Sequence, residues 1–252
     1  MARYSPSTTH VQFGPGPISQ AVRAILIACA GVYLLTLVWP PALFLLGVSP
    51  RDVIEDFRLW QPVTYIFVHT GMWHLVFNML GIWMFGVELE RRWGTPEFTR
   101  FFFLCGVVAG LATIAVALVP IGAVWRQESY VSITVGASGA FYGIAYAWAR
   151  AFPHRTVLML LVFPVQAKWF VTILIAMDFA LALSSGGRSG VAHVAHFAGL
   201  VTGYLYLNGG IGGGPGGLSA EMKYRYLRWK MNRLRKNFDV HDGGRDRKPW
   251  VH

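Results

Sequence analysis

The sequence predicts an all-α polytopic membrane protein, a bundle of six transmembrane helices with both termini in the cytoplasm. Of the 252 residues, 54% are hydrophobic and only 13% are charged. Soluble domains carry about a quarter charged residues, so the deficit is large. The apolar residues also gather in runs that approach the ~20 residues needed to cross a bilayer. These two observations place the chain among membrane proteins before any motif is considered.

Six apolar runs follow one another along the chain, and each predicts one membrane crossing. They cover residues 24–46, 72–86, 98–119, 136–148, 169–183 and 191–207. Pro40-Pro41 interrupts the first run, and a polar stretch follows it at 49–64. We expect 120–134 to be a loop, and the short run 158–165 either to extend the fourth span or to lie at the interface.

Basic residues set the expected orientation, because Lys and Arg concentrate on the cytoplasmic side of membrane proteins. If the N-terminus is cytoplasmic, eighteen Lys and Arg residues lie inside and four lie outside. Without the C-terminal tail the balance is still eight against four. Both termini are therefore expected in the cytoplasm. The protein itself is expected in the plasma (inner) membrane of a bacterium.

The chain is expected to have three parts, which are a cytoplasmic segment at 1–23, a membrane domain at 24–208 and a linker with a basic tail at 209–252. The first span would serve as an uncleaved anchor, since no cleavage site follows it. Ten of the twenty-two Lys and Arg residues lie between Lys223 and Lys248. Residues 220–238 form either a basic amphipathic helix on the anionic leaflet or a solvated tail that enforces topology. Nucleic acid is not expected as a partner.

Ser138 is a candidate nucleophile because polar side chains within membrane spans are costly. It stands in Gly136-Ala137-Ser138-Gly139, where the fourth span begins. Free backbone N–H groups at a helix N-terminus can stabilise an oxyanion. Taken alone, the motif fits equally a serine that caps a helix between packing glycines.

His196 favours the catalytic interpretation, since a serine needs a base and imidazole is the usual one. The fourth span carries Gly139 and Gly143, and the sixth carries Gly199 and Gly203. Glycines four residues apart allow membrane helices to pack closely. Such packing would bring the Ser138 hydroxyl to the His196 imidazole.

Three further polar residues suit a role beside such a pair. Tyr142 follows Ser138 by four residues, shares its helix face and can support the imidazole ring, although an interfacial or packing tyrosine is the alternative. His74 and Asn78 are also four apart, and both can donate hydrogen bonds to an oxyanion. Alone, this second pair would more simply join neighbouring helices.

In order along the chain, these motifs resemble the rhomboid intramembrane proteases. The resemblance covers roughly 60–203 and rests on Trp60-Gln61-Pro62-Val63-Thr64, His69, His74, Asn78, Glu90-Arg91-Arg92-Trp93-Gly94, Gly136-Ala137-Ser138-Gly139, Tyr142, Ala195-His196, Gly199 and Gly203. Family members often have Trp-Arg where this chain has Trp60-Gln61, which puts the anchoring of the loop after the first span in question.

The resemblance implies a serine endopeptidase with a Ser138–His196 dyad in a water-filled cavity open to the outer face. It implies that Tyr142 stacks beneath His196, and that His74, Asn78 and the Ser138 N–H form the oxyanion hole. Substrates would be single-span transmembrane proteins that enter from the lipid bilayer past the fifth span and are cut after a small residue. No cofactor or metal is expected. The oligomeric state is left open.

Asp178, in the fifth span, has two interpretations. At 1.5 Å per residue it lies at a depth similar to that of His196 and can orient the imidazole as a third triad member. It can also bond a neighbouring helix while protonated, because burial favours the neutral carboxyl. We favour the structural role, since an acid in this span is not part of the family's catalytic set. His193 is expected to line the cavity, and His69 to be structural.

Three other classes compete with the protease. A catalytically inactive relative would usually lack the serine or the histidine, and both are present. A histidine-ligated metal or haem protein would use His69, His74, His193 and His196, whose spacing matches no strong ligand motif. A transporter would have broken spans at corresponding positions in two halves, which the sequence lacks.

Overall fold

The structure is a computed structural model that describes residues 14–119, 123–159, 162–184 and 190–209, with 227, 228, 231 and 233. The chain divides into two compact units, Met1–Leu205 and Tyr206–His252. Of the second unit, the structure describes the end of the last long helix and four tail positions in helical conformation. The predicted tail helix at 220–238 and the glycine linker otherwise lie outside the described residues.

The first unit begins with a long helix that ends at the predicted interruption. Helix α1 spans Gln20–Val38, and α2 spans Pro41–Leu46. Pro41 occupies the first turn of α2, where its missing N–H costs nothing. The polar stretch that follows contains α3 (Pro50–Glu55), α4 (Gln61–Thr64) and the short 3₁₀ turn η1 (Tyr65–Phe67).

The second span is longer than predicted. Helix α5 (Met72–Gly81) continues through the π-helical turn η2 (Ile82–Gly86) into α6 (Val87–Trp93). The last turn holds Arg91 and Arg92, which favour a helix C-terminus. Gly94 then ends the helix with φ +87°, a conformation that suits glycine. Helix α7 (Thr95–Ala117) starts directly afterwards.

One expectation about the connections was wrong, because the predicted loop at 120–134 contains the helix α8 (Ala123–Val131). The run 158–165 does not extend the fourth span, since its described residues belong to a β-hairpin; its place at the interface stays a prediction. Strands β1 (Thr156–Met159) and β2 (Phe163–Gln166) pair in antiparallel register, with Val157 opposite Val165. The described part of the chain is therefore mostly helical, with one two-stranded sheet. A short apolar run does not by itself distinguish a strand from a helix.

The remaining helices are α9 (Ser138–Ala151), α10 (Ala167–Ser184) and α11 (Gly190–Leu207). Among the described residues, four helical segments are long and apolar enough to cross a membrane: Gln20–Val38, Met72–Trp93, Thr95–Ala117 and Ala167–Ser184. Helix α9 has only 14 residues, about 21 Å, which is less than the ~30 Å hydrocarbon core. The count of six crossings therefore remains a proposal.

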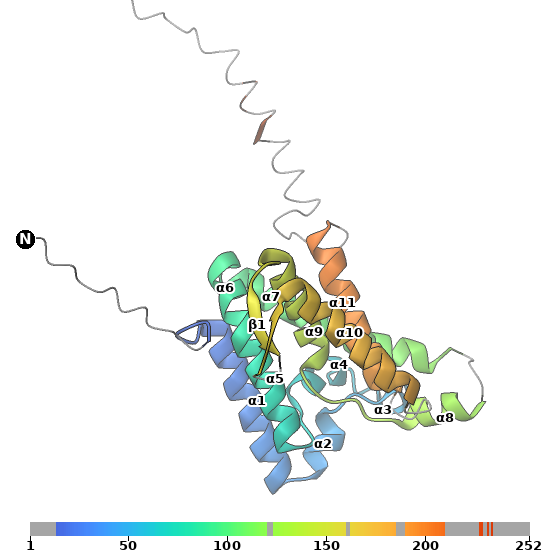
Figure 1. Cartoon of the computed structure of the whole chain (residues 1–252). Helices are drawn as coiled ribbons and strands as arrows, with labels where there is room; N and C mark the ends of the chain where they lie inside the picture. The colour runs from blue at the N-terminus through green and yellow to red at the C-terminus, as the bar shows by residue number, and fades with distance from the viewer. Residues whose placement is uncertain are drawn as a thin grey trace, which may run out of the picture. The chain divides into compact units, whose positions relative to one another are not determined.

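Burial distinguishes the inner helices from the outer ones. Within the most apolar 18-residue stretch of each helix, 50% of the residues are buried in α7, 22% in α1 and 17% in α10. Helix α7 packs along α6 and α9 (Figure 1), with Phe98, Phe101 and Phe102 inaccessible to solvent. The exposed apolar side chains of α1 and α10 suit contact with lipid, which is as apolar as they are.

Candidate active site

Ser138 is the first residue of α9, and the chain before it has an unusual backbone. Gly136 has φ +114°, and its N–H donates to the Tyr65 carbonyl oxygen at 2.9 Å. A Cβ at Gly136 would lie 2.8 Å from the His74 ring, so a larger residue would collide with that ring. Glycine thus lets the segment turn into the helix beside His74.

The structure brings Ser138 and His196 together across α9 and α11. Ser138 Oγ lies 2.7 Å from His196 Nε2, a hydrogen-bond distance. The His196 side chain is 20% exposed, so the ring can be reached from outside the protein. A serine hydroxyl that donates to an imidazole nitrogen is the arrangement in which the base can take the proton during nucleophilic attack.

Close contact between two glycine pairs makes this approach possible. A Cβ at Gly143 would lie 3.1 Å from the Gly199 carbonyl oxygen, and one at Gly203 would lie 3.1 Å from Gly143 Cα. At Gly199 a Cβ would overlap the Gly139 carbonyl group. These glycines therefore set the separation of the two helix backbones, as small residues do in membrane helix pairs.

Tyr142 holds one face of the base. Its ring stacks on the His196 ring with centroids 4.6 Å apart and an interplanar angle of 6°. Parallel stacking restricts rotation of the imidazole about its side-chain bonds while leaving both ring nitrogens free to form hydrogen bonds.

His74 and Asn78 lie on α5 beside the start of α9. The His74 ring packs against Gly136, two residues before Ser138. Asn78 is buried, and its amide nitrogen donates to the His74 carbonyl oxygen at 2.8 Å. One amide hydrogen remains for another acceptor. With the unpaired N–H groups of the first turn of α9, these side chains can supply donors to an oxyanion.

Asp178, on α10, contacts two histidines of the neighbouring helix α11. Its Oδ1 is 2.8 Å from His196 Nδ1 and also 2.8 Å from His193 Nδ1. The Tyr142 hydroxyl is close enough to interact with the same carboxylate. The contact of His193 with Asp178 was not predicted, although the three-residue spacing of His193 and His196 indicates a shared helix face.

His69 is almost fully buried beside the site, with its ring centroid 5.0 Å from that of His74. Its Nδ1 lies 3.2 Å from the Phe67 carbonyl oxygen. The pKa of His69 is lowered to about 4, chiefly because the ring is buried and to a smaller extent because His74 lies beside it. The ring is therefore neutral at physiological pH.

A cavity of about 270 Å³ adjoins this cluster between α9, α10 and α11. Its lining is mostly apolar and consists of Tyr142, Ile175, Asp178, Phe179, Ala182, His193, Phe197 and Leu200. Tyr142, Asp178 and His193 thus border a space large enough for a side chain of another molecule.

Comparison with known proteins identifies the family. A family model described as "Rhomboid domain" matches residues 56–210. The chain belongs to the rhomboid family. The match covers every residue of the cluster described above, which extends from His69, just before α5, to His196 on α11.

Several curated rhomboid proteins are similar to this chain. It is 25% identical to "Rhomboid protein 1, mitochondrial" of Saccharomyces cerevisiae over 208 residues, 80% of this chain and 55% of that protein. It is 28% identical to "Rhomboid protease AarA" of Providencia stuartii over 213 residues, 77% of this chain and 73% of that protein. For "Rhomboid protease GluP" of Bacillus subtilis, the identity is 26% over 160 residues, 63% of this chain and 27% of that protein. The chain thus spans about half of the yeast relative and about a quarter of GluP.

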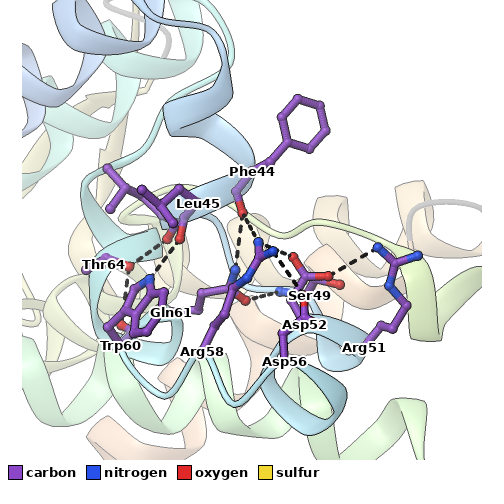
Figure 2. Close-up of polar contacts among 11 residues, drawn as sticks. Phe44, Leu45, Ser49, Arg51, Asp52, Asp56, Arg58, Trp60, Gln61 and Thr64 are labelled. Atoms are coloured by element: carbon purple, nitrogen blue, oxygen red, sulfur yellow. Dashed lines mark hydrogen bonds and ion pairs between the residues drawn. The ribbon is translucent and has the colours of Figure 1, made fainter.

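The segment in which this rhomboid departs from the family's Trp-Arg is nevertheless anchored. Gln61 is completely buried, its Oε1 accepts from the Ser49 N–H at 3.1 Å, and its Nε2 donates to the Phe44 carbonyl oxygen at 3.2 Å. Trp60 Nε1 donates to the Leu45 carbonyl oxygen at 2.9 Å. Figure 2 shows the bonds of Trp60 and Gln61 to Leu45 and Phe44, near the end of α2, and the bond of Gln61 to Ser49.

A second set of contacts holds the same segment by charge. Arg58 forms ion pairs with Asp52 and Asp56, each at 2.9 Å (Figure 2). Asp52 is buried, so its pairing with Arg58 satisfies a carboxylate that would otherwise be costly. In this rhomboid the amide of Gln61 and the guanidinium of Arg58 share the anchoring.

Proposed function

We propose that the protein is an intramembrane serine endopeptidase that cleaves transmembrane-anchored proteins near the outer face of the membrane. The observation that carries the proposal is the 2.7 Å contact between Ser138 Oγ and His196 Nε2. Membership in the rhomboid family and the similarity to curated rhomboid proteases support it.

The reaction would follow the course that this geometry permits. Ser138 Oγ attacks the scissile carbonyl carbon while His196 Nε2 takes the hydroxyl proton. The tetrahedral oxyanion is stabilised by donors from His74, Asn78 and the Ser138 N–H. His196 then gives its proton to the leaving amine as the peptide bond breaks. Water, activated by the same imidazole, hydrolyses the resulting ester and restores Ser138.

The arrangement of the helices supports entry of the substrate from the lipid. Helix α10 is the least buried of the four candidate membrane spans, and the cavity beside Tyr142 and His193 borders it. The substrate would be a single-span helix that unwinds next to α10 and presents an extended backbone to Ser138. The short α9 would place the serine below the membrane surface, where water from outside can reach it.

The distribution of basic residues supports cytoplasmic termini and an outward-facing site. Six crossings would result if α9 and α11 join the four candidate spans. The relatives include a mitochondrial protein as well as bacterial ones, and we propose the plasma membrane of a bacterium for this chain.

The proposal is tested with purified full-length protein in liposomes that contain a single-span substrate with a small residue at the cleavage site. We expect cleavage by the wild type, and losses of at least about 10³-fold in Ser138→Ala and His196→Ala. A fluorophosphonate, which reacts with activated serines, should label the wild type but not Ser138→Ala. Cleavage or labelling that persists in Ser138→Ala would refute the serine-protease proposal.

A further inference from the structure

One carboxylate oxygen of Asp178 contacts two imidazoles beside Ser138. Asp178 Oδ1 lies 2.8 Å from Nδ1 of His196 and 2.8 Å from Nδ1 of His193. Asp178 belongs to α10, and both histidines belong to α11, one helical turn apart. The three side chains are 14–20% exposed, so they are largely shielded from water.

These distances identify hydrogen bonds rather than an arrangement for a metal ion. The three ligand atoms lie within 4.8 Å of one another, which is close enough to consider zinc. With bonds of about 2.0–2.1 Å, however, the ligands of a tetrahedral zinc are roughly 3.3 Å apart. A separation of 2.8 Å is typical of a charge-assisted N–H···O bond.

The bond to Asp178 decides which tautomer His196 adopts. Because a carboxylate accepts and does not donate, Nδ1 of His196 must carry the hydrogen. Nε2 is then bare and can accept the Ser138 hydroxyl hydrogen across their 2.7 Å contact. In the opposite tautomer Nε2 carries a hydrogen and cannot act as a base. The carboxylate also stabilises the imidazolium that forms when the serine attacks.

His193 would hold the carboxylate itself. A single acceptor on a flexible side chain can turn away from the base, and a second donor to the same oxygen prevents this. We propose that Asp178 and His193 are a positioning pair for His196: Asp178 orients the imidazole that takes the Ser138 proton, and His193 holds Asp178 in place. The proposal rests on the protease function proposed above. Neither residue touches the reacting atoms.

The test compares Asp178→Asn, Asp178→Glu, His193→Ala and the double variant Asp178→Asn/His193→Ala in the reconstituted cleavage assay with a chelator present. Thr172→Val is the matched control, since Thr172 lies on the exposed side of α10 and bonds only the Lys168 carbonyl oxygen of its own helix. We expect Asp178→Asn to lower kcat about 100-fold with little change in KM. His193→Ala should lower kcat about 10-fold, and Asp178→Glu should recover part of the loss.

Two readouts separate positioning from a purely structural role. The double variant should be no slower than Asp178→Asn, because His193 acts only through Asp178. In Asp178→Asn the rising limb of the pH–rate profile should move to lower pH, because the imidazolium loses its stabilising carboxylate. The other titratable groups that face His196 are His74 on α5, Tyr142 on α9 and His193 on its own helix, and all are retained in Asp178→Asn.

The outcomes also separate this inference from the proposed function. Wild type that neither cleaves the substrate nor reacts with the fluorophosphonate would contradict the protease itself. Wild type that does both, while Asp178→Asn matches it in kcat and pH profile, would overturn the positioning pair alone. Losses of Asp178→Asn and His193→Ala that multiply in the double variant would overturn the link between them. A requirement for a divalent ion, seen as loss of wild-type cleavage with the chelator, would replace the pair with a metal site.

Discussion

The α-carbon of Gly199 on α11 faces the carbonyl group of Gly139 on α9 with no room for a methyl group between them. A Cβ on Gly139 in turn would lie 2.6 Å from Ala109 Cβ on α7. Helix α9 is therefore packed closely between α7 and α11 at Gly139, with no room for a side chain on either side. The position of Ser138, at the first turn of α9, depends on this contact.

Substituting Gly199 with alanine should separate α9 from α11 and withdraw His196 from Ser138. We expect Gly199→Ala to lower the cleavage rate at least 100-fold and to destabilise the protein by about 1–3 kcal/mol, the usual cost of overpacking. Cleavage of the single-span substrate and thermal unfolding in detergent measure the two effects. Gly31→Ala is the control, because nothing lies within 4 Å of its added Cβ, and it should match the wild type. Full activity in Gly199→Ala would show that the close contact is not needed.

The proposed oxyanion donors are tested by His74→Ala and Asn78→Ala. Each should lower kcat about 10²–10³-fold with KM nearly unchanged, because the donors act on charge that develops only in the transition state. Labelling by the fluorophosphonate should slow as well, because its attack by Ser138 also develops negative charge on oxygen. If Asn78→Ala lowered only the unfolding temperature, its amide would serve the bond to the His74 carbonyl and not the reaction.

Gln61 is expected to stabilise the segment after α2. Gln61→Leu removes the acceptor of the buried Ser49 N–H, and an unsatisfied buried donor costs about 1–3 kcal/mol. The loss should appear in thermal unfolding of the purified protein. Arg51→Ala provides the comparison within the same segment, since the Arg51 side chain is 54% exposed and its ion pair with Asp52 is long, at 3.4 Å. Such a pair contributes less than about 1 kcal/mol, so that variant should unfold near the wild type.

Glu90 joins α6 to α1 and α7, and its substitution should destabilise the protein more than that of Gln61. Its carboxylate accepts from the Ser19 and Thr95 hydroxyls at 2.5 and 2.7 Å and from the N–H groups of Ala21 and Val22 at 2.9 and 3.0 Å. A negative group at the start of α1 also favours the helix dipole. Glu90→Gln replaces one acceptor oxygen with a donor that faces donors.

We expect Glu90→Gln to destabilise the protein by about 3 kcal/mol, the scale of losing charged hydrogen bonds in a buried place. Thermal unfolding measures this change. Glu128→Gln is the matched control, because Glu128 is exposed on α8. Equal unfolding temperatures for the two variants would mean that the four bonds of Glu90 contribute nothing net.

Much of the architecture was predictable from hydropathy. Apolar runs at 72–86, 98–119 and 169–183 lie within or near Met72–Trp93, Thr95–Ala117 and Ala167–Ser184, because a helix must be apolar for most of its length to enter lipid. The family was also recognisable, since the motifs from Trp60 to Gly203 occur in order, and the family model confirms it. The roles of Ser138 and His196 remain predictions until the variants are measured.

Short and irregular connections were not predictable in the same way. The hairpin β1–β2 depends on pairing between residues such as Val157 and Val165, and α8 has only nine residues. Neither has a pattern long enough to separate strand, helix and loop. The departure at Gln61 likewise suggested a weaker anchor, and only the coordinates show that its amide bonds both Ser49 and Phe44.

By itself, the sequence determined that this is a helical membrane protein of the rhomboid family with a serine and a histidine in its apolar spans, since composition and local spacing are properties of the chain. Only the tertiary structure decided that His193 and His196 share one oxygen of Asp178, and that α9 and α11 meet at glycine. Such contacts join residues from different helices, and their geometry depends on how whole helices pack, which spacing along one helix does not specify.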